Sequence, residues 1–176
     1  MDDYNPYERL PRVETFQVTS ADVRDGEKFE PAHASGIMGA GGGDVSPQLA
    51  WSGFPEGTRS FCVTMYDPDA PTASGFWHWA VANIPAGVTE LPRGAGRGDE
   101  ALPRGAFHVP NEARMARYIG AAPPPGHGRH RYFIVVHAVD VPTLDIDRQS
   151  TPGSLGFQLF FHTLGRATIV PWYEAS

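Results

Sequence analysis

The sequence predicts a mostly β protein, an antiparallel β-sandwich with one or two short helices. Short runs of strand-forming residues recur along the chain, and 20 glycines and 17 prolines punctuate them as turns. Helical patterns do not alternate with the strands, which argues against a βαβ arrangement and its parallel sheet. The length of 176 residues suits one domain, residues 1–176, that buries its own core.

The strands are expected where apolar residues alternate with a period of two or form short buried runs. By this period Asp67 shares a face with Met65, and His78 shares a face with Ala80. Two of the runs are apolar on both faces, as expected for central strands. The expected strands are residues 14–19, 48–52, 59–67, 76–84, 130–140 and 167–173.

One helix is expected late in the chain, near residues 152–165. Thr151 can cap its first turn, and Pro152 takes the first helical position, where its missing N–H costs nothing. Leu155 and Leu159 then follow at helical spacing.

Charge and composition narrow the possible partners and compartment. The formal net charge of −6 argues against nucleic acid or an anionic membrane surface as the main partner. Cys62 is the single cysteine, so no intramolecular disulfide can form. The acidic start of the chain does not resemble a secretory signal, and the longest apolar run is too short for an integral membrane segment. A cytoplasmic location is therefore expected.

The stretch DPDAP, residues 67–71, is the first candidate for a functional element. Pro68 and Pro71 each fix a φ angle and restrict the preceding residue, so Asp67 and Asp69 have few directions in which to point. Both carboxylates could simply cap turns. Asp67, at the end of a strand face that is otherwise apolar, could instead lie at the rim of a pocket and would then need a partner.

His78, His130 and Tyr132 are the next candidates. His130 and Tyr132 are two residues apart in an expected strand and so project from one side, where an imidazole and a hydroxyl could hold an oxyanion. The alternatives are that His78 is a hydrogen-bonded core histidine, that Tyr132 is a half-buried strand aromatic and that His130 lies on a surface loop.

The sequence gives little evidence for a metal site or for an activated nucleophile. His127 and His130 have an H-x-x-H spacing that His78, His108 or Asp67 could complete, but no pair of thiolates is present. The sequence contains neither a G-x-S-x-G nucleophile elbow nor a G-x-x-x-x-G-K-[ST] phosphate loop. No metal and no cofactor are expected.

Three longer segments carry a resemblance to a known family. They are DVSPQLAWSGFP (44–55), MYDPDAPTASGFWHWAVANIP (65–85) and YIGAAPPPGHGRHRYFIVVHAVD (118–140). In this order they resemble the phosphatidylethanolamine-binding protein family, and in particular its bacterial Raf kinase inhibitor-like branch. The resemblance implies an antiparallel β-sandwich with a late helix and a pocket for phosphate-like anions at one end of the central sheet.

Carried over residue by residue, the resemblance implies which groups form the pocket. Its ligand-binding residues would be Asp67, His78, His130 and Tyr132, with backbone groups from Gly120 to Ala122, and with Asp69 and Pro71 shaping the rim. The family often has glycine where Ala122 stands. The chain stops at Ser176, so the mouth is expected to be open or covered by a partner subunit, since bacterial relatives are often homodimers.

The function expected from these residues is binding with a regulatory role. The ligand would be a small phosphorylated or anionic group: a phospholipid headgroup, a phosphomonoester or a phosphorylated side chain of a protein partner such as a kinase or protease. The alternative is a hydrolase or lyase acting on small phosphoesters or acids, with Asp67 as base and His78 as acid.

Overall fold

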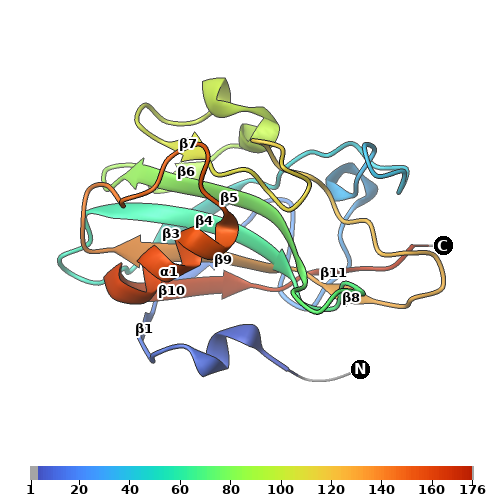
Figure 1. Cartoon of the computed structure of the whole chain (residues 1–176), viewed down its shortest axis with the longest axis horizontal. Helices are drawn as coiled ribbons and strands as arrows, with labels where there is room; N and C mark the ends of the chain where they lie inside the picture. Colours follow the sequence, from blue (N-terminus) through green and yellow to red (C-terminus); the bar gives the residue numbers. More distant parts are fainter. Residues whose placement is uncertain (1–3, 176) are drawn as a thin grey trace.

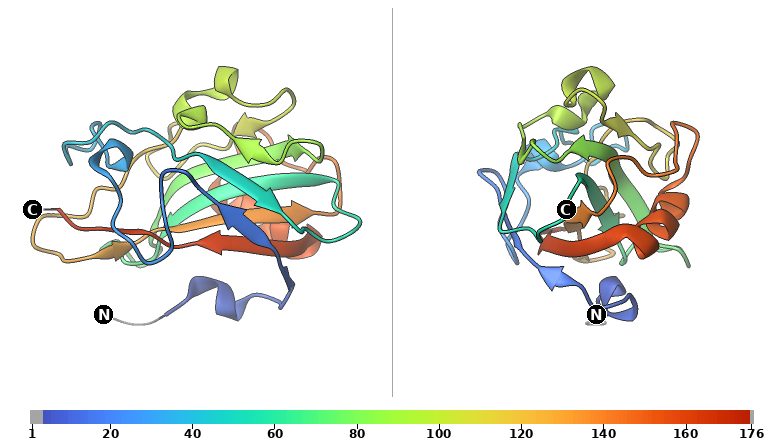
Figure 2. Two further views of the ribbon diagram at one scale, coloured as in Figure 1. Left: turned by 180° about the vertical axis from the view of Figure 1, so that it is seen from behind. Right: turned by 90° about the vertical axis from the view of Figure 1, so that its left-hand side faces the viewer.

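The computed structural model describes residues 4–175, and two sheets dominate it (Figure 1). The larger sheet has six strands in the order β1-β10-β9-β4-β5-β7. A three-stranded sheet, β2-β3-β6, lies over one of its faces, as the view from behind shows (Figure 2). The strands of the larger sheet are β1 (Glu14–Thr15), β4 (Ser60–Asp67), β5 (Phe76–Pro85), β7 (Phe107–His108), β9 (Phe133–Val139) and β10 (Thr163–Ile169).

The smaller elements complete this frame. The three-stranded sheet contains β2 (Gln17–Thr19), β3 (Leu49–Ser52) and β6 (Glu90–Leu91), and β8 (His130–Arg131) pairs separately with β11 (Trp172–Tyr173). The helices are the short 3-10 turns η1 (Pro6–Arg9), η2 (Pro31–His33), η3 (Ala95–Arg97) and η4 (Asp99–Ala101), and one α-helix, α1 (Pro152–His162). The prediction of a mostly β protein is confirmed.

Strand pairing corrects one detail of that prediction. The described pairs are antiparallel except β1 and β10, which run parallel at the edge of the larger sheet. The expected strand 14–19 splits at Phe16, so that β1 joins the larger sheet and β2 joins the smaller one. Phe16 is buried between them in the core, which explains why the chain changes sheets at this residue.

The central strands are buried on both faces, as their apolar sequences predict. On one face, Val63 and Met65 of β4 pack with Trp51 of β3 in the main core between the two sheets. On the other face, Cys62 of β4 packs with Leu155 and other residues of α1 in a second cluster. The larger sheet is therefore a shared wall between two apolar layers.

The helix begins as predicted and ends earlier. The hydroxyl of Thr151 accepts a hydrogen bond from the amide of Ser154 at 3.1 Å, and Pro152 occupies the first turn. The helix ends at His162 rather than near residue 165, and β10 starts at once at Thr163 rather than at 167. Hydrogen bonding to β9 from Thr163 onward draws the chain into the sheet. No helix in the described part of the chain is long and apolar enough to cross a membrane.

Candidate functional site

Strand ends from three parts of the chain meet at one end of the molecule, where β8, β11 and the turn after β4 lie together (Figure 1). Nδ1 of His130 is 2.7 Å from Oδ2 of Asp67, and both side chains are buried. Nε2 of His130 is 2.7 Å from Nδ1 of His127, which is exposed on the preceding loop. A carboxylate, a buried imidazole and a surface imidazole thus form a hydrogen-bonded chain from the sheet to solvent.

His78 reaches the same region because β5 carries a bulge. Met65 pairs with Trp79 and Tyr66 with Trp77, so His78 is an extra residue in β5. The prediction that His78 shares a face with Ala80 is therefore wrong: Ala80 packs in the cluster below α1. His78 instead makes an edge-to-face contact with Tyr132 of the main core, with ring centroids 5.2 Å apart.

The protonation of His78 follows from its surroundings. Nδ1 of His78 is 3.0 Å from the carbonyl oxygen of Ile119, which can only accept, so this nitrogen carries a hydrogen. Burial lowers the pKa of His78 to about 4, although the nearby charge of Asp67 acts in the opposite direction. At neutral pH the ring is uncharged, and its Nε2 has a lone pair available to accept a hydrogen bond.

Tyr132 adds a buried hydroxyl to this cluster. Its O–H has no acceptor within the described chain, and the residue is fully buried. Burial is the main cause that raises the pKa of Tyr132, Asp67 raises it further, and the backbone amide of Ala122 opposes both. A buried donor without a partner costs free energy, so this hydroxyl is a group that a ligand or water would satisfy.

Asp69 and Pro71 lie outside the cluster of Asp67, His78, His130 and Tyr132. The carboxylate of Asp69 accepts hydrogen bonds from the backbone and the guanidinium of Arg131, at 2.8 to 2.9 Å. Burial acts to raise the pKa of Asp69, but Arg131 outweighs it and holds the pKa below its usual value. Asp69 therefore ties the turn after β4 to β8, while Pro71 is exposed on the same turn.

The loop at Gly120 is tied to the glycine-rich loop through Asp44. The amide of Gly120 donates to Oδ1 of Asp44 at 2.8 Å and is thus already engaged. A side chain at this position would meet the backbone of Ala34 at 2.3 Å, which explains the glycine. Ala122 is half-buried and borders a surface hollow of about 540 Å³, together with Tyr173, the strand partner of His130.

Sequence reasoning passed over two groups that organise this site. It considered His127 only as a loop or metal residue, although its spacing from His130 brings the two rings into contact. It did not consider Asp44, because nothing local in GGGDVSP indicates a carboxylate that turns inward to a loop 76 residues away. Residues 4–175 contain no group of three or more His, Cys, Asp or Glu arranged to hold a metal ion.

Comparisons with known proteins agree with this arrangement of elements. The family model for phosphatidylethanolamine-binding proteins matches residues 19–174. The UPF0098 proteins YbhB and YbcL of Escherichia coli strain K12 are 44% and 46% identical to the chain over 90% of its length, covering 100% and 87% of their own lengths.

Solved structures show the same relationship. The crystal structure of E. coli YbcL, described as a member of the mammalian PEBP family, matches with a TM-score of 0.89 over 92% of this chain and 99% of that one. The structure of the PEBP homologue CT736 from Chlamydia trachomatis is 25% identical and matches with a TM-score of 0.75, over 93% of this chain and 99% of that one. The chain therefore belongs to the phosphatidylethanolamine-binding protein family.

Proposed function

We propose that the protein binds a phosphate-type anion at the end of the larger sheet, among Asp67, His78, His130 and Tyr132, and that binding takes up a proton. The observation that carries this proposal is the buried hydroxyl of Tyr132, whose O–H has no acceptor in the described chain although it lies beside the buried imidazole of His78. A phosphate oxygen would accept its hydrogen bond.

The proton follows from the orientation of the two buried rings. Asp67 accepts from Nδ1 of His130, and the Ile119 carbonyl accepts from Nδ1 of His78. In neutral His78, Nε2 is then an acceptor and would repel an anion, whereas Nε2 of His130 already lies 2.7 Å from Nδ1 of His127. An anion is held favourably once a ring gains a proton and donates from Nε2, or when the ligand keeps a P–OH that donates to it. Asp67 favours the first route at His78, since its negative charge opposes the effect of burial on the pKa of this ring.

The experiment is a calorimetric titration with inorganic phosphate and with sulfate at pH 5.5 and 7.5, in buffers of different ionisation enthalpy. Sulfate carries no proton in this range, so tighter sulfate binding at pH 5.5 reports protonation of the protein. We expect Tyr132→Phe to weaken phosphate binding about tenfold, because it removes one hydrogen bond to a charged group. Tyr66→Phe is the matched control, because its hydroxyl bonds to the carbonyl of Ser74 elsewhere on the sheet.

Equal phosphate affinity in the parent, Tyr132→Phe and His130→Gln would disprove the assignment. The ligand class includes a phospholipid headgroup, a phosphomonoester and a phosphorylated side chain of a protein partner, and competition by phosphoethanolamine or phosphoserine separates them. We also propose a cytoplasmic location, since the single cysteine is a buried free thiol.

One observation favours a second candidate, hydrolysis of small phosphoesters. A carboxylate that orients an imidazole, as Asp67 orients His130, is the arrangement used by general bases. His78 is a poor candidate for the acid, because its ring is neutral at pH 7. Its one N–H hydrogen, on Nδ1, is already donated to the carbonyl of Ile119. Turnover of 4-nitrophenyl phosphate that disappears in Asp67→Asn would favour this candidate over simple binding.

A further inference from the structure

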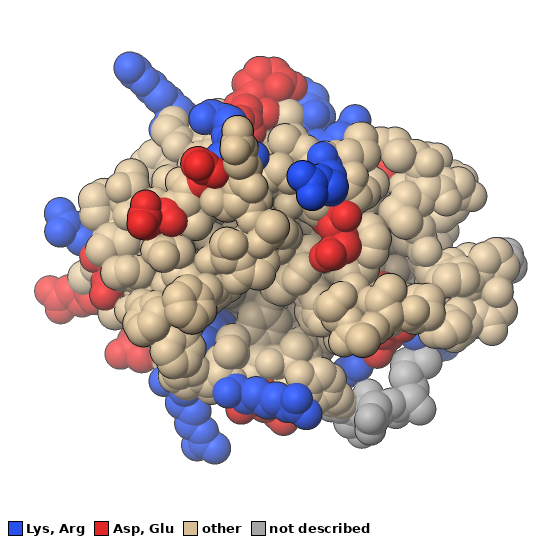
Figure 3. All heavy atoms as spheres, in the orientation of Figure 1, with Lys and Arg blue, Asp and Glu red and all other residues tan. Residues whose placement is uncertain are grey.

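A second cavity, of about 310 Å³, lies on the opposite face of the larger sheet from the candidate anion site. Thr64, Tyr66 and His137 of the sheet form its floor, α1 forms one wall, and η1 with Leu10 forms the other. The space-filling view shows a hollow on this face with mainly uncharged side chains around it (Figure 3). Its volume is at the lower end of the range for small-molecule sites.

One end of the cavity gathers polar groups that have no partner. Nδ1 of His137 and the hydroxyl of Thr163 are buried and make no hydrogen bond within the described chain, and the buried hydroxyl of Tyr7 has only the hydroxyl of Thr64 near it. His137 itself is only 3% exposed, and its Nε2 is held 3.1 Å from the hydroxyl of Thr64. Two unpartnered buried polar atoms at one end of a cavity are unusual in a folded protein and indicate a polar ligand group.

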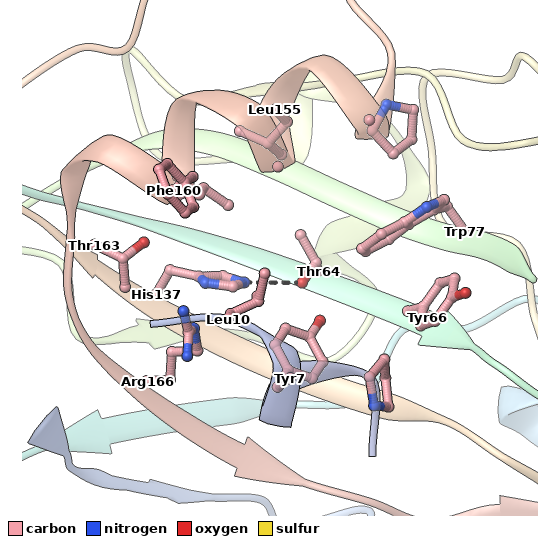
Figure 4. Close-up of a pocket in the computed structure, with 15 residues that line it drawn as sticks. Tyr7, Leu10, Thr64, Tyr66, Trp77, His137, Leu155, Phe160, Thr163 and Arg166 are labelled. Atoms are coloured by element: carbon pink, nitrogen blue, oxygen red, sulfur yellow. Dashed lines mark hydrogen bonds between the residues drawn. The ribbon is translucent and has the colours of Figure 1, made fainter. Parts of the chain in front are cut away.

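A guanidinium lies at the same end. Figure 4 shows Arg166 beside His137 and Thr163, with its side chain directed toward the cavity. Arg166 is half-buried, and no carboxylate of residues 4–175 lies within 4.0 Å of it. Within these residues its guanidinium makes one long hydrogen bond of 3.4 Å, to the carbonyl of Pro11, and lies 5.8 Å from the centroid of the Tyr7 ring. Burial accordingly lowers its pKa. A partly desolvated cation without a counter-ion is the feature that an anionic headgroup would complete.

The other end of the cavity is aromatic and aliphatic. Tyr66 and Trp77 lie at this end in Figure 4, with ring centroids 4.4 Å apart. Leu155 and Phe160 of α1 extend this surface toward the polar end.

The absence of a side chain at Gly156 leaves space between the helix and the cavity. Gly153 and Gly156 both border the cavity, although each glycine costs a helix roughly 1 kcal/mol relative to alanine. A Cβ added at Gly156 would meet no atom within 4 Å, so the space beside the helix is open.

We propose that this cavity binds an amphipathic monocarboxylate of medium length, with its carboxylate on Arg166 and its apolar body along Leu155 and Phe160 toward Trp77. The carboxylate would also accept a hydrogen bond from the hydroxyl of Thr163 or Tyr7. The site is independent of the proposed anion site, because the two lie on opposite faces of the sheet.

The test uses octanoate as the probe and 1-octanol as its neutral counterpart, each titrated into the full chain by calorimetry and by NMR shifts of the tryptophan side chains. We expect Arg166→Gln to weaken octanoate binding about tenfold or more and to change octanol binding by less than about threefold, since only the carboxylate pairs with the guanidinium. Arg166→Lys should retain most of the octanoate affinity, and octanol binding reports that each variant is folded.

A second variant tests the location. Gly156→Leu places a side chain in the open space and should abolish binding of both probes while leaving phosphate binding unchanged. Phe157→Leu is its control, because Phe157 is 66% exposed on the same helix and does not border the cavity. The proposal fails if octanoate does not bind, or if Gly156→Leu binds it as well as the parent. It also fails if Gly156→Leu instead dissociates a concentration-dependent dimer, which would assign the cavity to a second copy of the chain.

Discussion

Asp44 shows how much a single buried carboxylate organises around the candidate anion site. Its Oδ2 accepts from the amides of Gly36 and Ile37 at 2.9 Å, and its Oδ1 accepts from the amide of Gly120 at 2.8 Å. Burial acts to raise the pKa of Asp44, but these amides outweigh it and hold the pKa below its usual value. Asp44 thus joins the glycine-rich loop to the loop beside His78.

Asp44→Asn should destabilise the protein by about 2 kcal/mol, because an amide cannot accept on both sides as the carboxylate does. The folded pKa of Asp44 lies below its unfolded value of 3.8, so its contribution is complete above that value and is lost as pH falls through the folded pKa. Urea unfolding from pH 6 to 3 should therefore show a larger loss of stability in the parent than in the variant. If the free energy of unfolding falls equally with pH in the parent and in Asp44→Asn, the proposed role of the Asp44 carboxylate is contradicted.

At the scale of elements, the first turn of α1 is set by its own sequence, and the position of its last turn is set by the larger sheet. The Thr151 cap and Pro152 set the first turn, and Leu155 and Leu159 bury its inner face against the larger sheet. Phe157, Phe160 and Phe161 of this helix are 52 to 66% exposed, and Phe161 contacts each of the other two rings edge to face. The end of the helix is set by the pairing of Thr163 with Val139.

Thr151→Ala should lower the free energy of unfolding by about 1 kcal/mol, because the amide of Ser154 loses its acceptor. Thr151→Ser keeps a hydroxyl and should remain within about 0.5 kcal/mol of the parent. Chemical denaturation of the three proteins at one pH measures the difference. A serine variant as unstable as the alanine variant would show that packing of the threonine methyl, and not capping, is responsible.

At the scale of the whole molecule, the larger sheet buries a neutral histidine on each face. Burial lowers the pKa of His78 to about 4 beside the main core and that of His137 to about 3 beneath α1. The candidate anion site and the second cavity each contain one of these rings. Acidification therefore affects both faces of the fold.

Stability should fall as pH decreases from 7.5 to 5. The folded pKa of each ring lies below the unfolded value of 6.5, so the unfolded chain binds protons first, at a cost of roughly 2 kcal/mol per histidine by pH 5. His137→Gln should show a weaker dependence on pH than the parent in urea unfolding at the two pH values. The free energy of unfolding could instead change by the same amount between the two pH values in His137→Gln and in the parent. That result would mean that His137 is charged in the folded protein.

Local patterns in the sequence were sufficient for the class of fold and for several elements. The alternation in residues 59–67 predicts a common face for alternate residues, and Val63 and Met65 do pack together in the main core. Thr151 with Pro152 correctly starts the helix. The motifs around Asp67 and His130 identify side chains that form a direct hydrogen bond. Their role as ligand groups stays a prediction.

The sequence by itself determined the features that depend on neighbouring residues. These are which stretches form strands, where the capped helix begins, and which strand faces are apolar. Only the tertiary structure decided that β5 bulges at His78, that the chain changes sheets at Phe16, and that Asp44 turns toward Gly120. It alone also brought Tyr7, His137 and Arg166 to one cavity. The physical reason is that these features depend on hydrogen bonds and packing between segments far apart in the chain. The residues of one segment do not specify which distant segment will pack against it.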